Sequence, residues 1–333
     1  MNILITGAAG YIGSHVVKQL LSNSKYNLTV IDNFKTGFEK TILKLKNIGE
    51  INFINQDLSD WNSVDTIFKK NKFNVVIHFA ASLLVGESVT NPIKYYINNT
   101  CNTANIINMC NKYGVNKFIF SSTAAVYGEP NNGDVPLLES LQTSPINPYG
   151  SSKLFSEQII KDNAKSNKDF KYIILRYFNV AGAEESLTFG ECHDPETHLI
   201  PLVAKTALGK RDKIMIFGND YDTKDGTCVR DYIHVDDLAS AHISALDYLE
   251  ENNISNIFNC GYGHGFSVKE VIDTIREVSG VNFNVEITER REGDSAILIS
   301  DNKKILKLTN WNPKYDDLSF ICKTALEWEK KIG

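Results

Sequence analysis

The stretch Gly7-Ala8-Ala9-Gly10-Tyr11-Ile12-Gly13 lies near the N-terminus between two different kinds of sequence. The apolar run at residues 2–6 has the composition of a buried strand, and residues 11–21 carry apolar side chains at helical spacing. Glycines at these positions allow a tight turn, a close approach of backbone to a ligand, and close packing of helix on strand. The stretch therefore predicts a strand–turn–helix unit whose exposed N–H groups bind phosphate.

The same alternation continues through the first half of the chain. Runs rich in Val, Ile and Phe, typical of buried strands, occupy residues 2–6, 28–31, 51–55, 75–79, 117–121 and 172–177. Between them, apolar residues recur at helical spacing over residues 11–21, 61–70, 93–110 and 151–165. This pattern predicts an α/β fold, a Rossmann-type doubly wound parallel sheet with helices on both faces.

After residue 178 the alternation becomes irregular. Residues 179–217 contain few strand-like runs and a loop dense in Glu, His and Pro at residues 191–198. Helices are expected at residues 236–249, 268–278 and 317–330, and strands at residues 257–259 and 281–287. We expect a nucleotide-binding domain over residues 1–178. Residues 179–333 should form a smaller mixed α/β lobe that binds substrate, with some segments returning to the first domain.

An acidic residue at the end of the second expected strand indicates the cofactor. Val30-Ile31-Asp32 places a carboxylate 19 residues after Gly13, where it can accept hydrogen bonds from adenosine ribose hydroxyls. Because a carboxylate there repels a 2′-phosphate, the prediction is NAD rather than NADP. Residues 57–58 and 79–81 follow the third and fourth strands, at the strand ends where open α/β sheets bind ligands.

Tyr149-Gly150-Ser151-Ser152-Lys153 places a phenol and an ammonium group four residues apart, on one face of a helix. A phenol with its ordinary pKa of about 10 is a poor base at neutral pH. A nearby ammonium group and a positive nicotinamide ring would lower that pKa. Thr123, after the fifth strand, could share its proton with Tyr149. The second match to this spacing, at residues 113–117, is excluded because Gly114 breaks the helix before Lys117 enters a strand.

Composition excludes several classes of function. The chain of 333 residues has a net charge of −5, so nucleic acid and anionic membrane surfaces are not expected partners. No apolar run approaches the roughly 20 residues that a membrane span needs. The six cysteines and seven histidines are dispersed without CxxC or HExxH spacing, which predicts reduced thiols and no metal. The N-terminus lacks the features of an export signal, so a cytoplasmic location is expected.

The chain resembles the extended short-chain dehydrogenase/reductase family and, within it, the UDP-glucose 4-epimerases. The resemblance covers nearly the whole length and is most specific between Phe217 and Val235. Its further motifs are found at residues 85–88, 121–123, 147–153, 176–179, 216–221, 225–227, 229–235 and 290–291. It implies an NAD-dependent isomerase that inverts carbon 4 of a UDP-hexose, converting UDP-glucose to UDP-galactose through a transient 4-keto sugar.

The resemblance also implies roles for individual residues. Tyr149 would be the acid/base, Thr123 its hydroxyl partner and Lys153 the group that tunes its charge. The implied NAD-binding residues are Gly7, Gly10, Tyr11, Ile12, Gly13, Asp32, Asn33, Asp57, Leu58, Phe79, Ala80, Ala81, Asn98, Tyr149, Lys153 and Phe178. The implied UDP-sugar-binding residues are Thr123, Asn179, His198, Leu199, Phe217, Arg230, Tyr232, Arg291, Asp294 and Leu298. A homodimer would form through helices at residues 93–110 and 151–165.

Three features of the sequence bear on the alternative functions. Leu298 is neither a bulky aromatic nor a small residue, so a UDP-N-acetylglucosamine 4-epimerase or a bifunctional enzyme remains open. A nucleotide-sugar 4,6-dehydratase would need an acid and a base directly after Thr123, where this chain has Ala124-Ala125. A non-catalytic NAD-sensing protein typically lacks the Tyr or the Lys, and both are present.

The chain departs from many members of the family at Ser82-Leu83-Leu84, where a lysine often contacts the cofactor.

Overall fold

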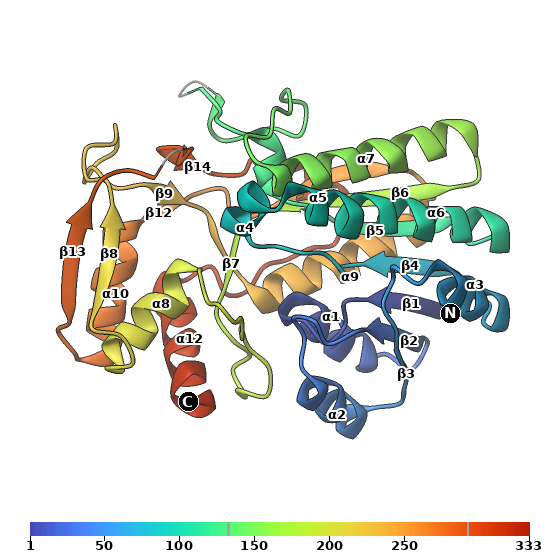
Figure 1. Cartoon of the computed structure of the whole chain (residues 1–333), viewed down its shortest axis with the longest axis horizontal. Coiled ribbons are helices and arrows are strands. Elements are labelled where there is room, and N and C mark those ends of the chain that lie inside the picture. Colours follow the sequence, from blue (N-terminus) through green and yellow to red (C-terminus); the bar gives the residue numbers. More distant parts are fainter. Residues whose placement is uncertain (132–133, 292) are drawn as a thin grey trace.

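The computed structural model describes residues 1–131, 134–291 and 293–333. Its centre is a seven-stranded parallel sheet in the order β11-β6-β5-β4-β1-β2-β3 (Figure 1). The strands are β1 (Asn2–Thr6), β2 (Asn27–Asp32), β3 (Ile51–Asn55), β4 (Val75–His78), β5 (Lys117–Ser121), β6 (Lys171–Tyr177) and β11 (Asn256–Cys260). The predicted Rossmann-type sheet is confirmed.

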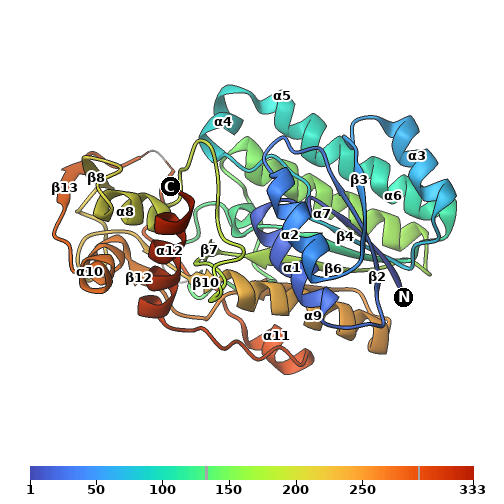
Figure 2. The same ribbon diagram turned by 90° about the horizontal axis from the view of Figure 1, so that it is seen from below.

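Helices cover both faces of this sheet because its strands are apolar on both sides. Along β1, Ile3 and Ile5 contribute to one buried cluster and Leu4 to another, as the two-residue period of a strand requires. On the face of Ile3, α1 (Tyr11–Leu21) packs against α2 (Glu39–Ile48) and α9 (Val235–Asn252). On the opposite face α6 (Asn102–Tyr113) packs against α3 (Trp61–Lys70) and α7 (Pro148–Ser166), and Figures 1 and 2 show the two layers.

The start of α7 is fixed by local sequence. The Asn147 side chain accepts a hydrogen bond from the N–H of Gly150 at 2.8 Å, and Pro148 occupies the first helical position. This cap places Tyr149 in the first turn of the helix. In contrast, α6 ends at Gly114 in the left-handed conformation (φ 72°), so Tyr113 and Lys117 lie in different elements as expected.

The remaining elements form smaller sheets and a helical layer at the other end of the molecule (Figure 1). β8 (Lys213–Phe217) pairs with β13 (Asn284–Thr288), and α8 (Leu199–Ala207), α10 (Val268–Ser279) and α12 (Leu318–Ile332) pack together beside them. β7 (Asn179–Ala181) pairs with β10 (Tyr232–His234), and β9 (Val229–Arg230) lies between β12 (Phe266–Ser267) and β14 (Ile297–Leu298). The chain also returns to the central sheet, where β11 pairs with β6.

Two sequence-based expectations need correction. The helix expected at residues 93–110 is three elements: α5 (Pro92–Tyr95), the π-helical η1 (Tyr96–Cys101) and α6. Apolar spacing does not distinguish an α-helix from one π-helical turn, and here Asn99 turns inward to bond Ser82. The strand expected at residues 281–287 begins at Asn284, because Gly280 ends α10 at φ 67° and a short connection follows.

Three short helices, α4 (Val85–Thr90), α11 (Lys303–Leu308) and the 3₁₀ turn η2 (Ala124–Tyr127), complete the described elements. None of the helices formed by the described residues combines the length and the apolar character needed to cross a bilayer.

Candidate active site

A cleft lies at the carboxyl ends of the central strands. Its empty volume is about 530 Å³, and it is lined by Gly7, Ile31, Asp32, Asn33, Lys35, Thr36, Gln56, Asp57, Leu58, Ala80, Ala81, Ser82, Asn98 and Asn102. The structure therefore brings eight of the sequence-predicted cofactor residues together: Gly7, Asp32, Asn33, Asp57, Leu58, Ala80, Ala81 and Asn98. The position agrees with the rule that open α/β sheets bind ligands at this edge.

The glycine turn at the edge of this cleft has no room for side chains. Gly7 has φ +75°, and a Cβ there would lie 2.7 Å from the backbone nitrogen of Ala80. A Cβ on Gly13 would lie 2.2 Å from the carbonyl oxygen of Gly7. Helix α1 starts at Gly10 with no acidic residue in its first turn, so its positive end suits a diphosphate.

Asp32 is held in a fixed orientation at the end of β2. Its carboxylate accepts hydrogen bonds from the N–H groups of Ala9 at 2.9 Å and Phe34 at 2.8 Å. Burial raises the pKa of Asp32 above its ordinary value, and these backbone donors oppose that rise. Asn33 donates to Asp57 at 2.8 Å, which joins the ends of β2 and β3. These groups fit an adenosine ribose, and the cleft as a whole fits a dinucleotide.

The predicted catalytic residues meet at the end of β5. Thr123 follows Ser121 and Ser122, while Tyr149 and Lys153 lie on successive turns of α7. Burial raises the pKa of Tyr149, and a hydrogen bond from Thr123 opposes that rise. Burial also lowers the pKa of Lys153 to about 7. In the chain by itself, burial and Thr123 therefore set the direction of the Tyr149 pKa shift. The role of Lys153 in making this phenol acidic stays a prediction that includes the positive nicotinamide ring.

The backbone carbonyl of Ser121 accepts a hydrogen bond from Lys153 Nζ at 2.8 Å. The residues behind this corner were not predicted from the sequence. Glu157, one turn beyond Lys153 and fully buried, accepts hydrogen bonds from Ser122 Oγ at 2.6 Å and from two nitrogens of Arg176 at 2.9 and 2.6 Å. The available signal in the sequence was Glu157, four residues after Lys153 in the same helix, together with Arg176 in the following strand.

Asn99 is a second residue that sequence reasoning missed. It is buried, and its side chain bonds the N–H of Ser82 at 2.8 Å, the carbonyl of Ser82 at 3.0 Å and Ser152 Oγ at 3.0 Å. The neighbouring Asn98, which was predicted, donates to Ser82 Oγ at 3.2 Å. These bonds connect the cofactor cleft to the helix that carries Tyr149 and Lys153.

The residues predicted to hold a diphosphate form a group in the second half of the chain. Arg291 donates to Asp294 at 2.9 Å, and its guanidinium group lies 4.6 Å from the centre of the Phe217 ring. Arg230 lies 3.6 Å from the same carboxylate and donates to the carbonyls of Val229 at 2.9 Å and Ser295 at 2.8 Å. Two guanidinium groups that share one carboxylate, one of them beside an aromatic ring, suit a nucleoside diphosphate.

Other predicted residues connect this group to the catalytic corner. Leu298 is opposite Arg230 in the β14–β9 pair and packs against the small apolar cluster that contains Phe178 and Ala124. Tyr232 is buried in β10, directly opposite Asn179 in β7. Phe79 packs against His242, with ring centres 4.8 Å apart, and so lies beside the cofactor cleft rather than among its lining residues.

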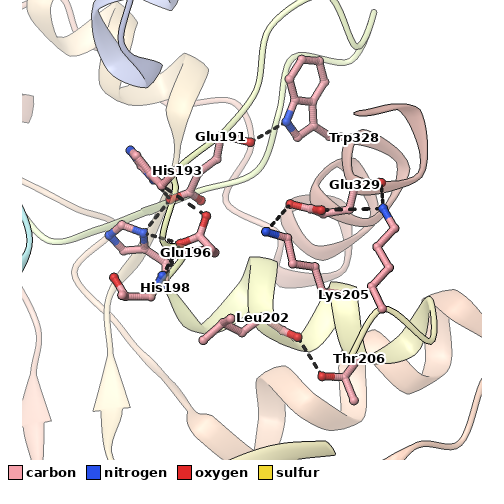
Figure 3. A network of polar contacts seen from close by, with 11 residues as sticks. Glu191, His193, Glu196, His198, Leu202, Lys205, Thr206, Trp328 and Glu329 are labelled. Atoms are coloured by element: carbon pink, nitrogen blue, oxygen red, sulfur yellow. Dashed lines mark hydrogen bonds and ion pairs between the residues drawn. The ribbon is translucent and has the colours of Figure 1, made fainter. Parts of the chain in front are cut away.

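Two predicted residues have partners that the sequence did not suggest. Tyr11 donates its hydroxyl proton to the carbonyl of Gly182 at 2.5 Å. His198 precedes Leu199, the first residue of α8, and its Nδ1 lies 2.8 Å from Glu191 and 2.9 Å from Glu196 (Figure 3). Burial alone would lower the pKa of His198, but the two carboxylates raise it to about 10. The histidines are therefore not evenly dispersed in space, since His193 joins the same group.

Comparison with known proteins agrees with this geometry. Residues 3–261 match the NAD dependent epimerase/dehydratase family. This chain belongs to that family. The UDP-glucose 4-epimerase of Halalkalibacterium halodurans is 45% identical over 331 residues, covering 99% of this chain and 96% of that protein. The resemblance to the UDP-glucose 4-epimerases is thus confirmed.

Solved structures of the same family are similar over their full length. The UDP-Glc/GlcNAc 4-epimerase of Campylobacter jejuni is 55% identical, with a TM-score of 0.88 and 99% of both chains covered. The UDP-glucose 4-epimerase of Bifidobacterium longum in complex with NAD⁺ and UDP is 37% identical, with a TM-score of 0.93, covering 100% of this chain and 99% of that one. NAD is the cofactor of this family, and the turn at Gly7 and the carboxylate of Asp32 fit it.

Proposed function

We propose that this chain catalyses NAD-dependent epimerisation at carbon 4 of a UDP-hexose, interconverting UDP-glucose and UDP-galactose, with Tyr149 as the acid/base. The observation that carries these roles is the position of Thr123, Tyr149 and Lys153 at the same edge of the sheet as the cleft beside Gly7 and Asp32. A reacting sugar at this corner would lie between a dinucleotide and the guanidinium groups of Arg230 and Arg291.

In this reaction NAD, when bound, accepts the hydride from carbon 4 of the sugar and returns it to the opposite face. Tyr149 removes the proton of the 4-hydroxyl group and later gives it back to the 4-keto oxygen. Thr123 hydrogen-bonds that oxygen, and Lys153 stabilises the phenolate form of Tyr149. Arg230 and Arg291 hold the diphosphate, so the keto sugar can turn while the nucleotide stays in place.

Replacing Tyr149 by Phe tests this assignment, because only the hydroxyl is removed. We expect turnover to fall by at least about 10²–10⁴-fold, the usual contribution of a general acid/base, while NAD stays bound. NMR of the UDP-sugars measures turnover, and absorbance after denaturation measures NAD. Tyr113→Phe is the matched control, since Tyr113 has the same spacing to a lysine but bonds Asp65 on the surface. Turnover retained in the Tyr149→Phe variant would reject the role.

The second substrate that we propose is UDP-N-acetylglucosamine. Leu298 packs against the cluster that contains Phe178 and is smaller than an aromatic side chain, so we expect it to accommodate a 2-N-acetyl group. The Campylobacter jejuni relative, a UDP-Glc/GlcNAc 4-epimerase, supports this proposal. Incubation with each UDP-sugar should yield both 4-epimers, and Leu298→Tyr should slow the N-acetyl sugar selectively. Absence of UDP-N-acetylgalactosamine would restrict the function to UDP-glucose.

We also propose a homodimer and a cytoplasmic location. Three hydrophobic side chains on α4, α5 and α7 are unusually exposed: Val89 (62%), Ile93 (63%) and Phe155 (50%). These helices contact one another, and their exposed apolar side chains are the candidates for a dimer interface. Sedimentation of the wild type at micromolar concentration should show a dimer, and the Phe155→Asp variant should be a monomer. A monomeric wild type would reject the proposed dimer.

The six free cysteines support the proposed location in a reducing compartment.

A further inference from the structure

Four side chains of metal-binding type converge in the loop before α8. Glu191, His193, Glu196 and His198 each direct one ligand atom into a common space, and these atoms all lie within 4.8 Å of one another. His193 Nδ1 is 3.1 Å from Glu191 and 3.8 Å from Glu196. The whole set comes from eight consecutive residues (Figure 3).

These separations match a compact coordination sphere. Ligands about 2.0–2.1 Å from a tetrahedral zinc ion lie about 3.3 Å from each other. The closest oxygen–nitrogen pairs here are 2.8, 2.9, 3.1 and 3.8 Å apart. To hold an ion, the three shorter pairs must separate slightly and the longest must approach. The His198 side chain is 39% exposed, which leaves a path for an ion to enter.

The two carboxylates also have free acceptors in a buried position. Glu191 is 3% exposed, and within the described part of the chain its Oε2 and that of Glu196 are buried without a hydrogen-bond partner. Glu196 Oε1, in contrast, accepts the backbone N–H groups of Thr197 and His198, both at 2.8 Å. Oε1 is thus held by backbone and by His198 Nδ1 at 2.9 Å, and Oε2, 3.8 Å from His193 Nδ1, is left for a ligand. A buried carboxylate oxygen without a donor is costly unless a cation satisfies it.

The loop is also anchored from outside. Trp328 in α12 donates its indole N–H to the carbonyl of Glu191 at 2.5 Å. Behind it, Lys205 of α8 pairs with Glu329 of α12 at 3.9 Å (Figure 3). Such contacts hold the ligands in place before an ion arrives, as outer contacts do in metal sites generally.

We propose that Glu191, His193, Glu196 and His198 bind a single Zn²⁺ ion. Two imidazole nitrogens with two carboxylates are a mixed N/O set that suits zinc, whereas Mg²⁺ and Ca²⁺ prefer oxygen ligands alone. Both imidazoles bind as neutral ligands after releasing a proton to solvent, so the two carboxylates balance the charge of the ion. The proposal is independent of the proposed epimerase function.

The ion has a structural role in this arrangement. It would close the loop at residues 191–198 onto the first turn of α8. It also lies beside the glycine turn, because the His193 ring is edge-on to Tyr11 with centres 6.3 Å apart. Zinc therefore fixes the segment between the cofactor cleft and α8, and its absence should loosen that segment, including His198 and Leu199, without changing Thr123, Tyr149 or Lys153.

The test uses the full chain, freed of metal with a chelator and then titrated with ZnCl₂ by calorimetry. One ion per chain is expected, together with a higher unfolding temperature and, with Co²⁺, the visible absorption of a tetrahedral centre. His193→Gln and Glu191→Gln should each weaken binding at least about tenfold, by analogy with the loss seen when outer contacts of a metal site are removed. Far-UV circular dichroism and retained NAD confirm that both variants are folded.

Two control variants test whether zinc binds through side chains outside the proposed set of four. His264→Gln removes a histidine paired with Asp316 on the surface, and Cys192→Ser removes the thiol inside the loop. Both should bind one zinc ion as the wild type does. No binding by the wild type would overturn the proposal, as would loss of the ion in Cys192→Ser or in His264→Gln. Undiminished binding in both His193→Gln and Glu191→Gln would overturn it as well.

Discussion

Lys153 Nζ donates a hydrogen bond to the backbone carbonyl of Ser121 across 2.8 Å, and the same ammonium group lies 5.0 Å from the centre of the Phe120 ring. The lysine is thus fixed to the end of β5, two residues before Thr123. It is 3% exposed, and burial lowers its pKa to about 7. A buried amine is costly, and this one lies at the corner where the proposed reaction needs a phenolate.

This burial predicts a specific dependence of stability on pH. In the unfolded chain the lysine keeps its ordinary pKa of 10.5, whereas in the folded chain the pKa is about 7. Between these values the unfolded state binds more protons, so the free energy of unfolding of the wild type rises with pH. Relative to Lys153→Met, it should rise by roughly 1 kcal/mol per pH unit between pH 7.5 and 9.5. Urea denaturation of the two NAD-free proteins measures the difference, and parallel curves would contradict the assignment.

The glycine turn predicts a loss of cofactor binding. In Gly13→Ala the new methyl group would lie 2.2 Å from the Gly7 carbonyl, and both groups belong to backbone that has little freedom to move. The turn must therefore open, and we expect NAD affinity to fall at least about tenfold, since about 1.4 kcal/mol suffices for that change. Calorimetric titration with NAD measures the loss.

Gly86→Ala is the matched control for that experiment. A Cβ at Gly86 meets no atom within 4 Å, and the residue lies inside α4, where alanine is favoured over glycine. Its NAD affinity should equal that of the wild type. If Gly13→Ala and Gly86→Ala bind NAD equally well, the turn does not hold the diphosphate in the way described.

The buried pair behind the catalytic corner predicts a large effect on stability. Glu157→Gln removes the charge that balances Arg176, which is 2% exposed, and should destabilise the chain by about 3–5 kcal/mol. The double variant Glu157→Leu/Arg176→Met replaces both charges by apolar groups and should recover most of that loss. Chemical denaturation measures both variants. A double variant as unstable as Glu157→Gln would show that packing, rather than the uncompensated charge, dominates.

Much of the central sheet could be predicted from the sequence because its signals are local. The strands β1, β3 and β5 and the helices α1 and α3 have the predicted bounds, since each is an apolar run or stripe that ends in a turn or a cap. Asp60, for example, caps α3 by accepting the N–H of Ser63. The position of Gly7 and Asp32 at the cleft was predictable for the same reason, because their spacing within one strand–helix–strand unit determines their place.

The features that could not be predicted from the sequence depend on contacts between distant segments of the chain. The bond from Asn99 to Ser82 spans 17 residues, and the one from Tyr11 to Gly182 spans 171. β8 was not predicted because it lies in the part of the sequence without regular alternation and its partner β13 lies about seventy positions later. The direction of the Tyr149 pKa shift could not be predicted either, because it depends on burial that only the assembled fold provides.

The buried side chain of His78 predicts how the stability of the chain depends on pH under acidic conditions. Its Nδ1 lies 2.6 Å from Thr6 Oγ1 and its Nε2 lies 3.0 Å from Thr103 Oγ1, so the ring connects β4 to β1 and α6. Burial lowers the pKa of His78 to about 3, whereas the unfolded chain has the ordinary value of 6.5. The folded state therefore binds fewer protons between these values, and stability is lost as the pH falls below about 6.5.

Replacing His78 by Gln keeps a polar group at this position but removes the titration. We expect the variant to be less stable than the wild type at pH 7, because the geometry of two hydrogen bonds is disturbed at a cost of about 1–3 kcal/mol. Between pH 6 and pH 4.5 the gap should narrow by roughly 1 kcal/mol per unit, since only the wild type has this histidine to protonate on unfolding. Denaturation at several pH values measures the gap. A constant or widening gap would show that His78 is not held neutral in the folded chain.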